Sequence, residues 1–393
     1  MARSDTTTPL RPGLLAVLRA WGRIGCIGFG GPPTHIALLR ELCVERRRWL
    51  DAREFEDAVA VCNLLPGPAS TQLAIYCAWR VRGRPGALVG GVAFIAPGLV
   101  LILALAALFL AGSPPRWVRG AGAGAGAAVA AVAVQAGWSL VPASWASARR
   151  SGRVRWLLYL AAGAAAAATV GPWLVVVLLA CGAIELAAQL AGRGGTSART
   201  LLPLPPLAAA GAGIAGGVLL SLVWVAFKVG ALSYGGGFVI VPLMQADAVG
   251  HYHWMSGGQF LNAVALGQVT PGPVTQTVAV VGYAAAGLGG GLLAAAVAFA
   301  PSFAFILLGG GQFDRLRADR RVRAFLDGSG PAAIGAILGS AVPLAAALDQ
   351  PWQYAVLAGA AVPLALRRGV VPTLLAAAVV GILVAVAGGP LPA

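Results

Sequence analysis

Charged side chains are scarce in this chain of 393 residues. Asp, Glu, Lys and Arg make up 10% of it, whereas 59% of the residues are apolar and the mean hydropathy is +0.82. That balance excludes an ordinary soluble domain. Uncharged runs such as 86–115, 120–148 and 248–313 exceed the ~20 residues that a helix needs to cross a bilayer. We therefore expect an all-α polytopic membrane protein with about 10–13 transmembrane helices in the lipid bilayer.

Residues that build metal or catalytic centres are also few. The five cysteines form no Cys-x-x-Cys pair and the three histidines form no ligand cluster, so we predict no metal site, no cofactor and no disulfide framework. No Ser-His-Asp, His-Glu-x-x-His or P-loop pattern occurs. We therefore expect no enzyme and no ATP drive, and we rank a membrane enzyme or an assembly subunit well below a transporter. Transport would use an ion gradient, the membrane potential or a separate energising subunit.

Acidic residues are rarer than basic ones, and the formal net charge is +15. The basic residues stand in short clusters between apolar runs, a pattern typical of membrane topology signals, so we expect no nucleic-acid partner. Lys228 is the one lysine, and the excess of Arg, Ala and Gly indicates a GC-rich bacterial genome. Arg19 and Arg23 interrupt the first apolar stretch and no small-residue cleavage site follows, so we expect no removable signal peptide.

Two segments of the chain match each other at a constant offset of 205 residues, which predicts an internal duplication. The matched pairs are Gly25 and Gly230, Gly30-Gly31 and Gly235-Gly236, Trp49 and Trp254, Phe55 and Phe260, Pro66-Gly67-Pro68 and Pro271-Gly272-Pro273, and Phe94 and Phe299. A slip of one residue follows, because Pro97 answers Pro301. We predict repeats at 1–195 and 207–393, joined by a proline-rich linker at 196–206.

The positive charges differ between equivalent loops of the two repeats. Arg80, Arg82 and Arg84 have uncharged equivalents, whereas the cluster at 315–323 answers a stretch with few charges. Because cytoplasmic loops attract Arg and Lys, we expect the repeats to be inverted. The cluster at 46–48 fits this topology only if nearby acidic residues neutralise it, or if the segments at 12–30 and 55–79 are re-entrant.

The two Pro-Gly-Pro tripeptides predict breaks in helices. Proline lacks the backbone N–H and clashes with the preceding turn, so a helix cannot continue through this sequence. Freed backbone groups at membrane depth need protein, water or a ligand as partners, and we expect both breaks to line a substrate site. We predict that Pro68 and Pro273 start half-helices whose N-termini bind an anion. The polar residues that follow are further candidates: Ser70, Thr71, Gln72, Thr275, Gln276 and Thr277.

Charged residues within apolar segments complete the candidate site. Arg23 and Lys228 occupy matched positions, and we predict that they are the charge partners of the anion, with snorkelling to the interface as the alternative. Asp57 is the candidate for a coupling proton, with Glu185 a weaker one. The glycines at 30–31 and 235–237 permit tight turns, and helix packing explains most other glycines.

Several motifs in register resemble the chromate transporter family, in its long two-domain form. They are Phe29-Gly-Gly-Pro-Pro-Thr-His35, Leu65-Pro-Gly-Pro-Ala-Ser-Thr-Gln72, Phe94-Ile-Ala-Pro-Gly98, Lys228-Val-Gly-Ala-Leu-Ser-Tyr-Gly-Gly-Gly237 and Thr270-Pro-Gly-Pro-Val-Thr-Gln276. The resemblance implies a protein of the bacterial plasma membrane that exports chromate and confers resistance to it, with antiparallel domains and with sulfate as an analogue. It makes the Gly-Gly and Pro-Gly-Pro motifs the signature. Uptake or export of sulfate or another divalent oxyanion is the alternative, and a homodimer is a further expectation.

Overall fold

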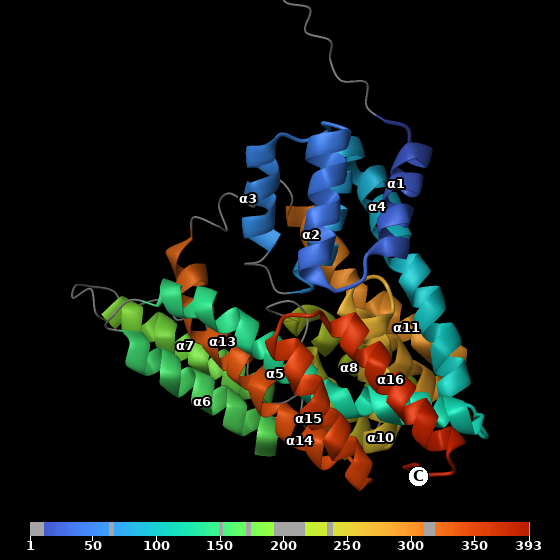
Figure 1. The fold of residues 1–393 in the computed structure, drawn as a ribbon. Helices are drawn as coiled ribbons and strands as arrows, with labels where there is room; N and C mark the ends of the chain where they lie inside the picture. The colour runs from blue at the N-terminus through green and yellow to red at the C-terminus, as the bar shows by residue number, and fades with distance from the viewer. Residues whose placement is uncertain are drawn as a thin grey trace, which may run out of the picture.

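The computed structural model describes residues 12–62, 67–148, 152–169, 174–191, 217–233, 239–309 and 319–392, and these form helices without strands (Figure 1). Pro66, Gly235, Gly236 and the predicted linker at 196–206 lie outside the described residues. The all-α fold expected from the composition is confirmed. Uninterrupted helices satisfy their own backbone hydrogen bonds, which the apolar interior of a membrane requires.

The two halves follow the same order of elements, except that η6 and α14 are additional in the second half. The first half holds α1 (Leu14–Ile27), α2 (Pro32–Arg40), the π-helical turn η1 (Glu41–Arg46), α3 (Ala52–Cys62), α4 (Ala69–Phe109), α5 (Arg116–Ser147), α6 (Arg153–Thr169) and α7 (Leu174–Ala191). The second half holds α8 (Val218–Leu232), α9 (Ile240–Gln245), the π-helical turn η5 (Ala246–His251), α10 (Gly257–Val269), the 3-10 turn η6 (Val274–Gln276), α11 (Thr277–Gly309), α13 (Arg320–Gly339), α14 (Ala341–Ala346), α15 (Pro351–Ala365) and α16 (Val370–Val386).

Irregular features of the backbone recur at the repeat offset. The π-helical turns η1 and η5 start 205 residues apart, and so do the left-handed residues Arg48 (φ 49°) and His253 (φ 53°). These features rarely arise by chance in two places, because π-turns and left-handed non-glycine residues are both uncommon. The two halves therefore share a backbone structure as well as sequence motifs.

The one-residue slip between the repeats lies earlier than the sequence comparison indicated. The kinks of α4 and α11 occur at Gly83 (φ 67°) and Gly287 (φ 64°), which are already 204 residues apart. A Cβ on Gly25 would overlap the carbonyl oxygen of Phe94, and one on its mate Gly230 would overlap that of Ala298. Phe94 is therefore the repeat equivalent of Ala298, and the predicted pairing of Phe94 with Phe299 is wrong.

Five of the described helical segments are long and apolar enough to cross a membrane. They are Ala69–Phe109, Arg116–Ala146, Leu174–Ala191, Val274–Gly309 and Arg320–Ala346. By contrast, α1 has 14 residues and α3 has 11, fewer than the ~20 needed for a span. Their lengths fit the re-entrant alternative for the segments at 12–30 and 55–79.

The arginines at 80–84 lie at a sharp turn between two helices, as their cluster suggested. The element α4 consists of two helical arms that join where Arg82 and Gly83 leave helical geometry. Glycine permits this turn because its φ of 67° is strained for other residues. The second arm folds back on the first, since a Cβ on Gly90 would overlap the Cβ of Ala78, and the expected boundary between the two segments is confirmed.

The arms of α4 and α11 that follow the kinks run antiparallel to each other. A Cβ on Gly91 would lie 2.5 Å from Phe303 Cε1, and one on Gly291 would lie 2.5 Å from Leu103 Cδ2. Residue numbers rise along one arm as they fall along the other, so the arms point in opposite directions. Two equivalent helices that cross a bilayer antiparallel have inverted topologies, the arrangement expected from the charges.

The two halves are intertwined. Helix α5 of the first half packs on α15 and α16 of the second half. Its equivalent α13, of the second half, packs on α6 and α7 of the first half (Figure 1). Close backbone contacts seal both interfaces, since a Cβ on Gly120 would overlap Gly381 and a Cβ on Gly163 would overlap Ala332. Small residues permit such approach between membrane helices. Each repeat thus completes the core of the other.

Candidate functional site

Both Pro-Gly-Pro tripeptides interrupt helices, as predicted. Helix α3 is described as far as Cys62, and α4 begins at Ala69 with Pro68 as its N-cap residue. Helix α10 ends at Val269, and Pro273 is the N-cap residue of η6. The central glycines have φ values of 120° at Gly67 and 100° at Gly272. Only glycine adopts this backbone without strain, which explains the middle residue of each tripeptide.

Each break is hydrogen-bonded to the other half of the chain. Gly67 donates its N–H to the carbonyl oxygen of Ser233 at 2.7 Å, and Gly272 donates its N–H to that of Gly28 at 3.0 Å. These four residues are two repeat-related pairs, because 67 and 272 differ by 205 and so do 28 and 233. The bonds are therefore reciprocal, and the two breaks meet across a local pseudo-two-fold axis.

The slip between the repeats lies at the breaks themselves. A Cβ on Gly67 would overlap Gln72, five residues later, whereas a Cβ on Gly272 would approach Gln276, four residues later. The first half continues as an α-helix and the second as the 3-10 turn η6. A 3-10 turn needs 3.0 residues against 3.6 for an α-turn, so Gln276 reaches the same place with one residue fewer.

Buried side-chain oxygens without hydrogen-bond partners gather at these breaks. In the described part of the chain they include the hydroxyls of Thr71, Ser233, Thr275 and Ser302, together with Oε1 of Gln276. All five side chains are at most 1% exposed. An unsatisfied buried polar group costs roughly 1–3 kcal/mol, and such groups persist where water, an ion or a ligand supplies the missing partner.

Residues of each half approach the break of the other. The hydroxyl oxygen of Ser302 in α11 lies 3.4 Å from the place of a Cβ on Gly67. Gly98 of α4, the repeat equivalent of Ser302, lies against the carbonyl oxygen of Pro271, and Gln276 Nε2 donates to the carbonyl oxygen of Ile95 at 2.8 Å. A movement between the halves therefore changes both breaks.

His35 links the two breaks through its ring. The side chain is fully buried; Nε2 lies 2.9 Å from the carbonyl oxygen of Gly28 and Nδ1 lies 3.2 Å from Ser70 Oγ. Phe94 packs edge-on against the imidazole at 5.0 Å between ring centroids. Because Gly28 also accepts the N–H of Gly272, one imidazole connects the second break to the first turn of α4.

The predicted charge partners of the anion have different surroundings. Arg23 is exposed on α1. Lys228 is largely buried and its Nζ lies 2.6 Å from Asp247 Oδ2, in an ion pair without an equivalent in the first half, where Leu42 stands in place of Asp247. Asp57 is partly buried on α3.

The remaining candidates serve identifiable structural roles. Gly30 and Gly31 have φ values of 97° and 76° and form the turn before α2, which begins with Pro32. Thr277 donates its hydroxyl to the carbonyl oxygen of Val274 at 2.8 Å. Glu185 accepts two hydrogen bonds from Arg155, at 2.7 and 3.1 Å.

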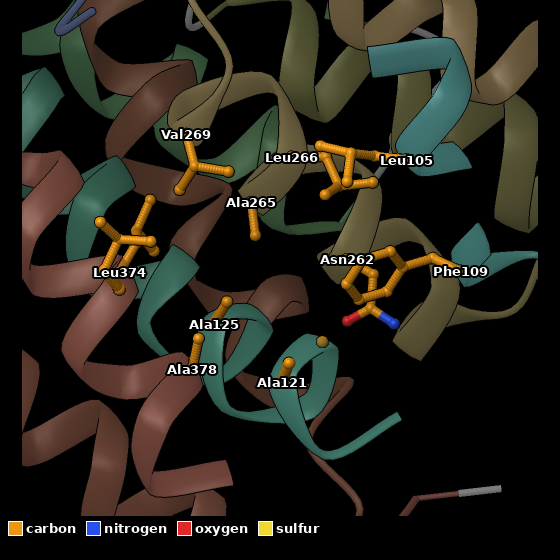
Figure 2. A pocket seen from close by; sticks show the side chains of 12 residues that line it. Leu105, Phe109, Ala121, Ala125, Asn262, Ala265, Leu266, Val269, Leu374 and Ala378 are labelled. Carbon is orange, nitrogen blue, oxygen red and sulfur yellow. The ribbon is translucent and has the colours of Figure 1, made fainter. Parts of the chain in front are cut away.

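A separate cavity of about 160 Å³ lies between α4, α5, α10 and α16 (Figure 2). Its lining is apolar except for Asn262, the repeat equivalent of Asp57. A divalent oxyanion needs several hydrogen-bond donors or positive charge, and this lining offers only the amide of Asn262. The cavity therefore does not suit an oxyanion.

Sequence reasoning missed His35, Ser233 and Ser302 as parts of this region. His35 stands in the Gly-Gly-Pro-Pro motif, but it has no counterpart in the second half, where Ile240 occupies the matched position. Ser302 directly follows Pro301, the mate of Pro97, and that proline was the available signal. Ser233 lies within the motif at 228–237, but its place at the first break depends on the packing of the halves.

Comparison with known proteins places the chain in a family of transporters. The family model described as Chromate transporter matches residues 15–186 and 220–387. A chromate transport protein of Cupriavidus metallidurans is 33% identical over 82% of this chain and 80% of its own length. One of Pseudomonas aeruginosa is 30% identical over 87% and 84%, and a probable chromate transport protein of Synechococcus elongatus is 28% identical over 88% of both chains. No solved structure matches the chain.

These matches confirm the resemblance drawn from the motifs, and with it a transporter rather than an enzyme. The family model covers both halves and leaves out the region around the predicted linker. Together with the five candidate spans, the bacterial relatives indicate a multi-pass protein of the plasma membrane.

Proposed function

The chain belongs to the chromate transporter family, and we propose that it exports chromate across the bacterial plasma membrane and so confers resistance to chromate. The observation that carries the proposal is the group of buried hydroxyls without partners at the two reciprocal breaks. A tetrahedral dianion accepts several hydrogen bonds at once, which these groups are free to donate.

Helix N-termini add to the affinity of the site for an anion. The first turn of α4 begins immediately after the first break, and the first N–H groups of a helix lack intrahelical partners and carry partial positive charge. The neutral hydroxyls of Thr71 and Ser302 supplement this field without a fixed counter-charge. We propose that such a site releases its anion readily, because the direct contacts of the anion are hydrogen bonds from neutral groups.

The membrane potential supplies a driving force for export. One elementary charge gains about 2.3 kcal/mol in crossing 100 mV, so a dianion that leaves a cell with a negative interior gains about 4.6 kcal/mol. Export down this potential needs no ATP site, which agrees with the absence of a P-loop from the sequence.

The antiparallel halves provide a route for alternating access. We propose that this conformation is occluded, because Thr71, Ser233, Thr275 and Ser302 are buried at the breaks. We propose that rocking of one half against the other opens the site to each side in turn, as inverted repeats do in other transporters. The reciprocal bonds of Gly67 and Gly272 are the contacts that such a movement breaks.

Everted membrane vesicles test the proposal directly, because an exporter accumulates labelled chromate inside them. We expect accumulation that depends on the membrane potential, and at least a tenfold loss in the double variant Thr71→Val/Thr275→Val at normal membrane abundance. Thr373→Val is the matched control, because the Thr373 hydroxyl donates to the carbonyl oxygen of Gly369 in α16. Failure of the wild-type chain to accumulate chromate would refute the proposal, and full activity of the double variant would remove these hydroxyls from the site.

Excess sulfate in the same vesicles tests selectivity, since both ions are tetrahedral dianions. Equal competition would extend the substrate to divalent oxyanions in general. Anion binding by Arg23 and Lys228, proton coupling by Asp57 and a homodimeric state stay predictions from the sequence.

A further inference from the structure

We infer that His35 takes up one proton when the oxyanion binds, and that this proton turns the Ser70 hydroxyl into a donor for the anion. The inference rests on the proposed function of the breaks. It assigns to His35 a positioning role that acts through Ser70.

The hydrogen bonds fix the tautomer of His35. The carbonyl oxygen of Gly28 can only accept a hydrogen bond, so the nitrogen 2.9 Å from it, Nε2, carries a proton. In the neutral ring Nδ1 is then an acceptor, and Ser70 Oγ at 3.2 Å donates its hydrogen to it. Ser70 therefore presents only lone pairs to its other neighbours, which repel an anion.

Protonation of the ring reverses this bond. A cationic imidazole carries hydrogens on both nitrogens, so Nδ1 donates to Ser70 Oγ and the Ser70 hydrogen becomes free to turn toward the oxyanion. Ser70 is 2% exposed and stands beside Thr71, whose hydroxyl has no partner in the described structure. The bond from Nε2 to Gly28 is kept in both states, so the second break does not move.

The surroundings of the ring favour proton uptake only together with an anion. Burial against Phe94 disfavours a lone cation, and the contacts of the ring recorded in the described structure, to Gly28, Ser70 and Phe94, include no charged group. Arg40 of α2 itself pairs with Glu45 and Glu56 at 3.7 and 3.5 Å. An arriving dianion supplies the missing opposite charge, so the two binding events are linked.

The proton site belongs to the first half alone. Ile240 occupies the position equivalent to His35 in the second half, and it does not titrate. The structure therefore predicts a single proton for each anion bound, although the two breaks are otherwise related by the repeat.

Titration calorimetry of the purified full-length chain with chromate, in alkaline buffers of different ionisation enthalpy, counts the protons taken up. We expect about one proton per chromate for the wild-type chain. His35→Gln keeps a donor for the Gly28 carbonyl but does not titrate, and we expect chromate binding without proton uptake. His35→Asn places an amide near the Nδ1 position and tests the same point if the first variant fails to fold. His253→Asn, at an exposed left-handed position, is the control and should keep the proton.

The outcomes separate this inference from the proposed function. A wild-type chain that binds no chromate contradicts the proposed function. Chromate binding without proton uptake, or equal uptake by wild type and His35→Gln, overturns the inference while the function stands. Loss of uptake in Asp57→Asn but not in His35→Gln would also overturn it and would assign the proton to Asp57.

Discussion

The ion pair between Lys228 and Asp247 tests whether the one lysine of the chain serves the fold or the substrate. Their side chains are 14% and 7% exposed, and Nζ lies 2.6 Å from Oδ2. Lys228→Met leaves the Asp247 carboxylate buried without a partner. Asp247→Leu leaves the Lys228 ammonium buried without a partner. Breaking a buried pair in this way costs about 3–5 kcal/mol of the free energy of unfolding.

The double variant Lys228→Met/Asp247→Leu removes both charges at once. Replacement of a buried pair by apolar residues is often neutral, so we expect the double variant to have a larger free energy of unfolding than either single variant. The contact of Nζ with the Trp224 ring, at 5.7 Å from its centroid, is lost in the double variant as well, and costs about 0.5–2 kcal/mol on its own. The double-mutant cycle of the wild type, the two single variants and the double variant therefore gives the interaction energy of the charge pair separately from that of the aromatic contact.

Unfolding in detergent, followed by tryptophan fluorescence, measures the four chains of the cycle. Arg46→Met is the matched control, because its pair with Glu41 at 2.9 Å is largely exposed and such pairs contribute about 0–1 kcal/mol. A double variant as unstable as either single variant would refute the reasoning. Chromate accumulation by a stable double variant would make Lys228 structural, and its loss at normal abundance would support anion binding by Lys228.

Two further predictions concern the breaks and the topology. Gly67→Ala and Gly272→Ala should each lower membrane abundance and chromate transport, because a side chain in the left-handed region costs about 1–2 kcal/mol. Gly289→Ala is the control: a Cβ there meets open space, and the variant should gain up to ~1 kcal/mol of helix propensity. Equal behaviour of the three variants would contradict the strain argument. Reporter fusions after Pro115 and after Asp319, which precede the equivalent helices α5 and α13, should lie on opposite sides of the membrane, and reporters on the same side would contradict the inverted repeat.

Much of the architecture follows from the sequence alone. Hydropathy identifies a membrane protein, and the all-α fold follows because helices satisfy their backbone hydrogen bonds within lipid. The offset of 205 residues identifies the repeat, and the tripeptides at 66–68 and 271–273 locate both breaks, because proline forbids a continuous helix. Residue identity and spacing along the chain carry each of these features, so they can be read without knowledge of the packing.

Other features depend on contacts between residues far apart in the chain. The slip in the second break was misplaced because a 3-10 turn and an α-turn differ in residues per turn, which side-chain identity does not reveal. The packing of α5 and α13 on helices of the opposite half depends on close backbone approach at particular glycines. Composition shows that these residues are small, but not which helix each one contacts.

The Pro-Gly-Pro breaks show where the division lies. The sequence by itself determined that two helices end at these places and that polar residues such as Thr71 and Thr275 follow. Only the tertiary structure decided that Ser233 and Ser302 of the second half complete the first break, that Lys228 is paired with Asp247, and that His35 reaches from Gly28 to Ser70. The physical reason is that a site between two halves is made by their packing, and packing depends on shapes and distances that no local pattern encodes.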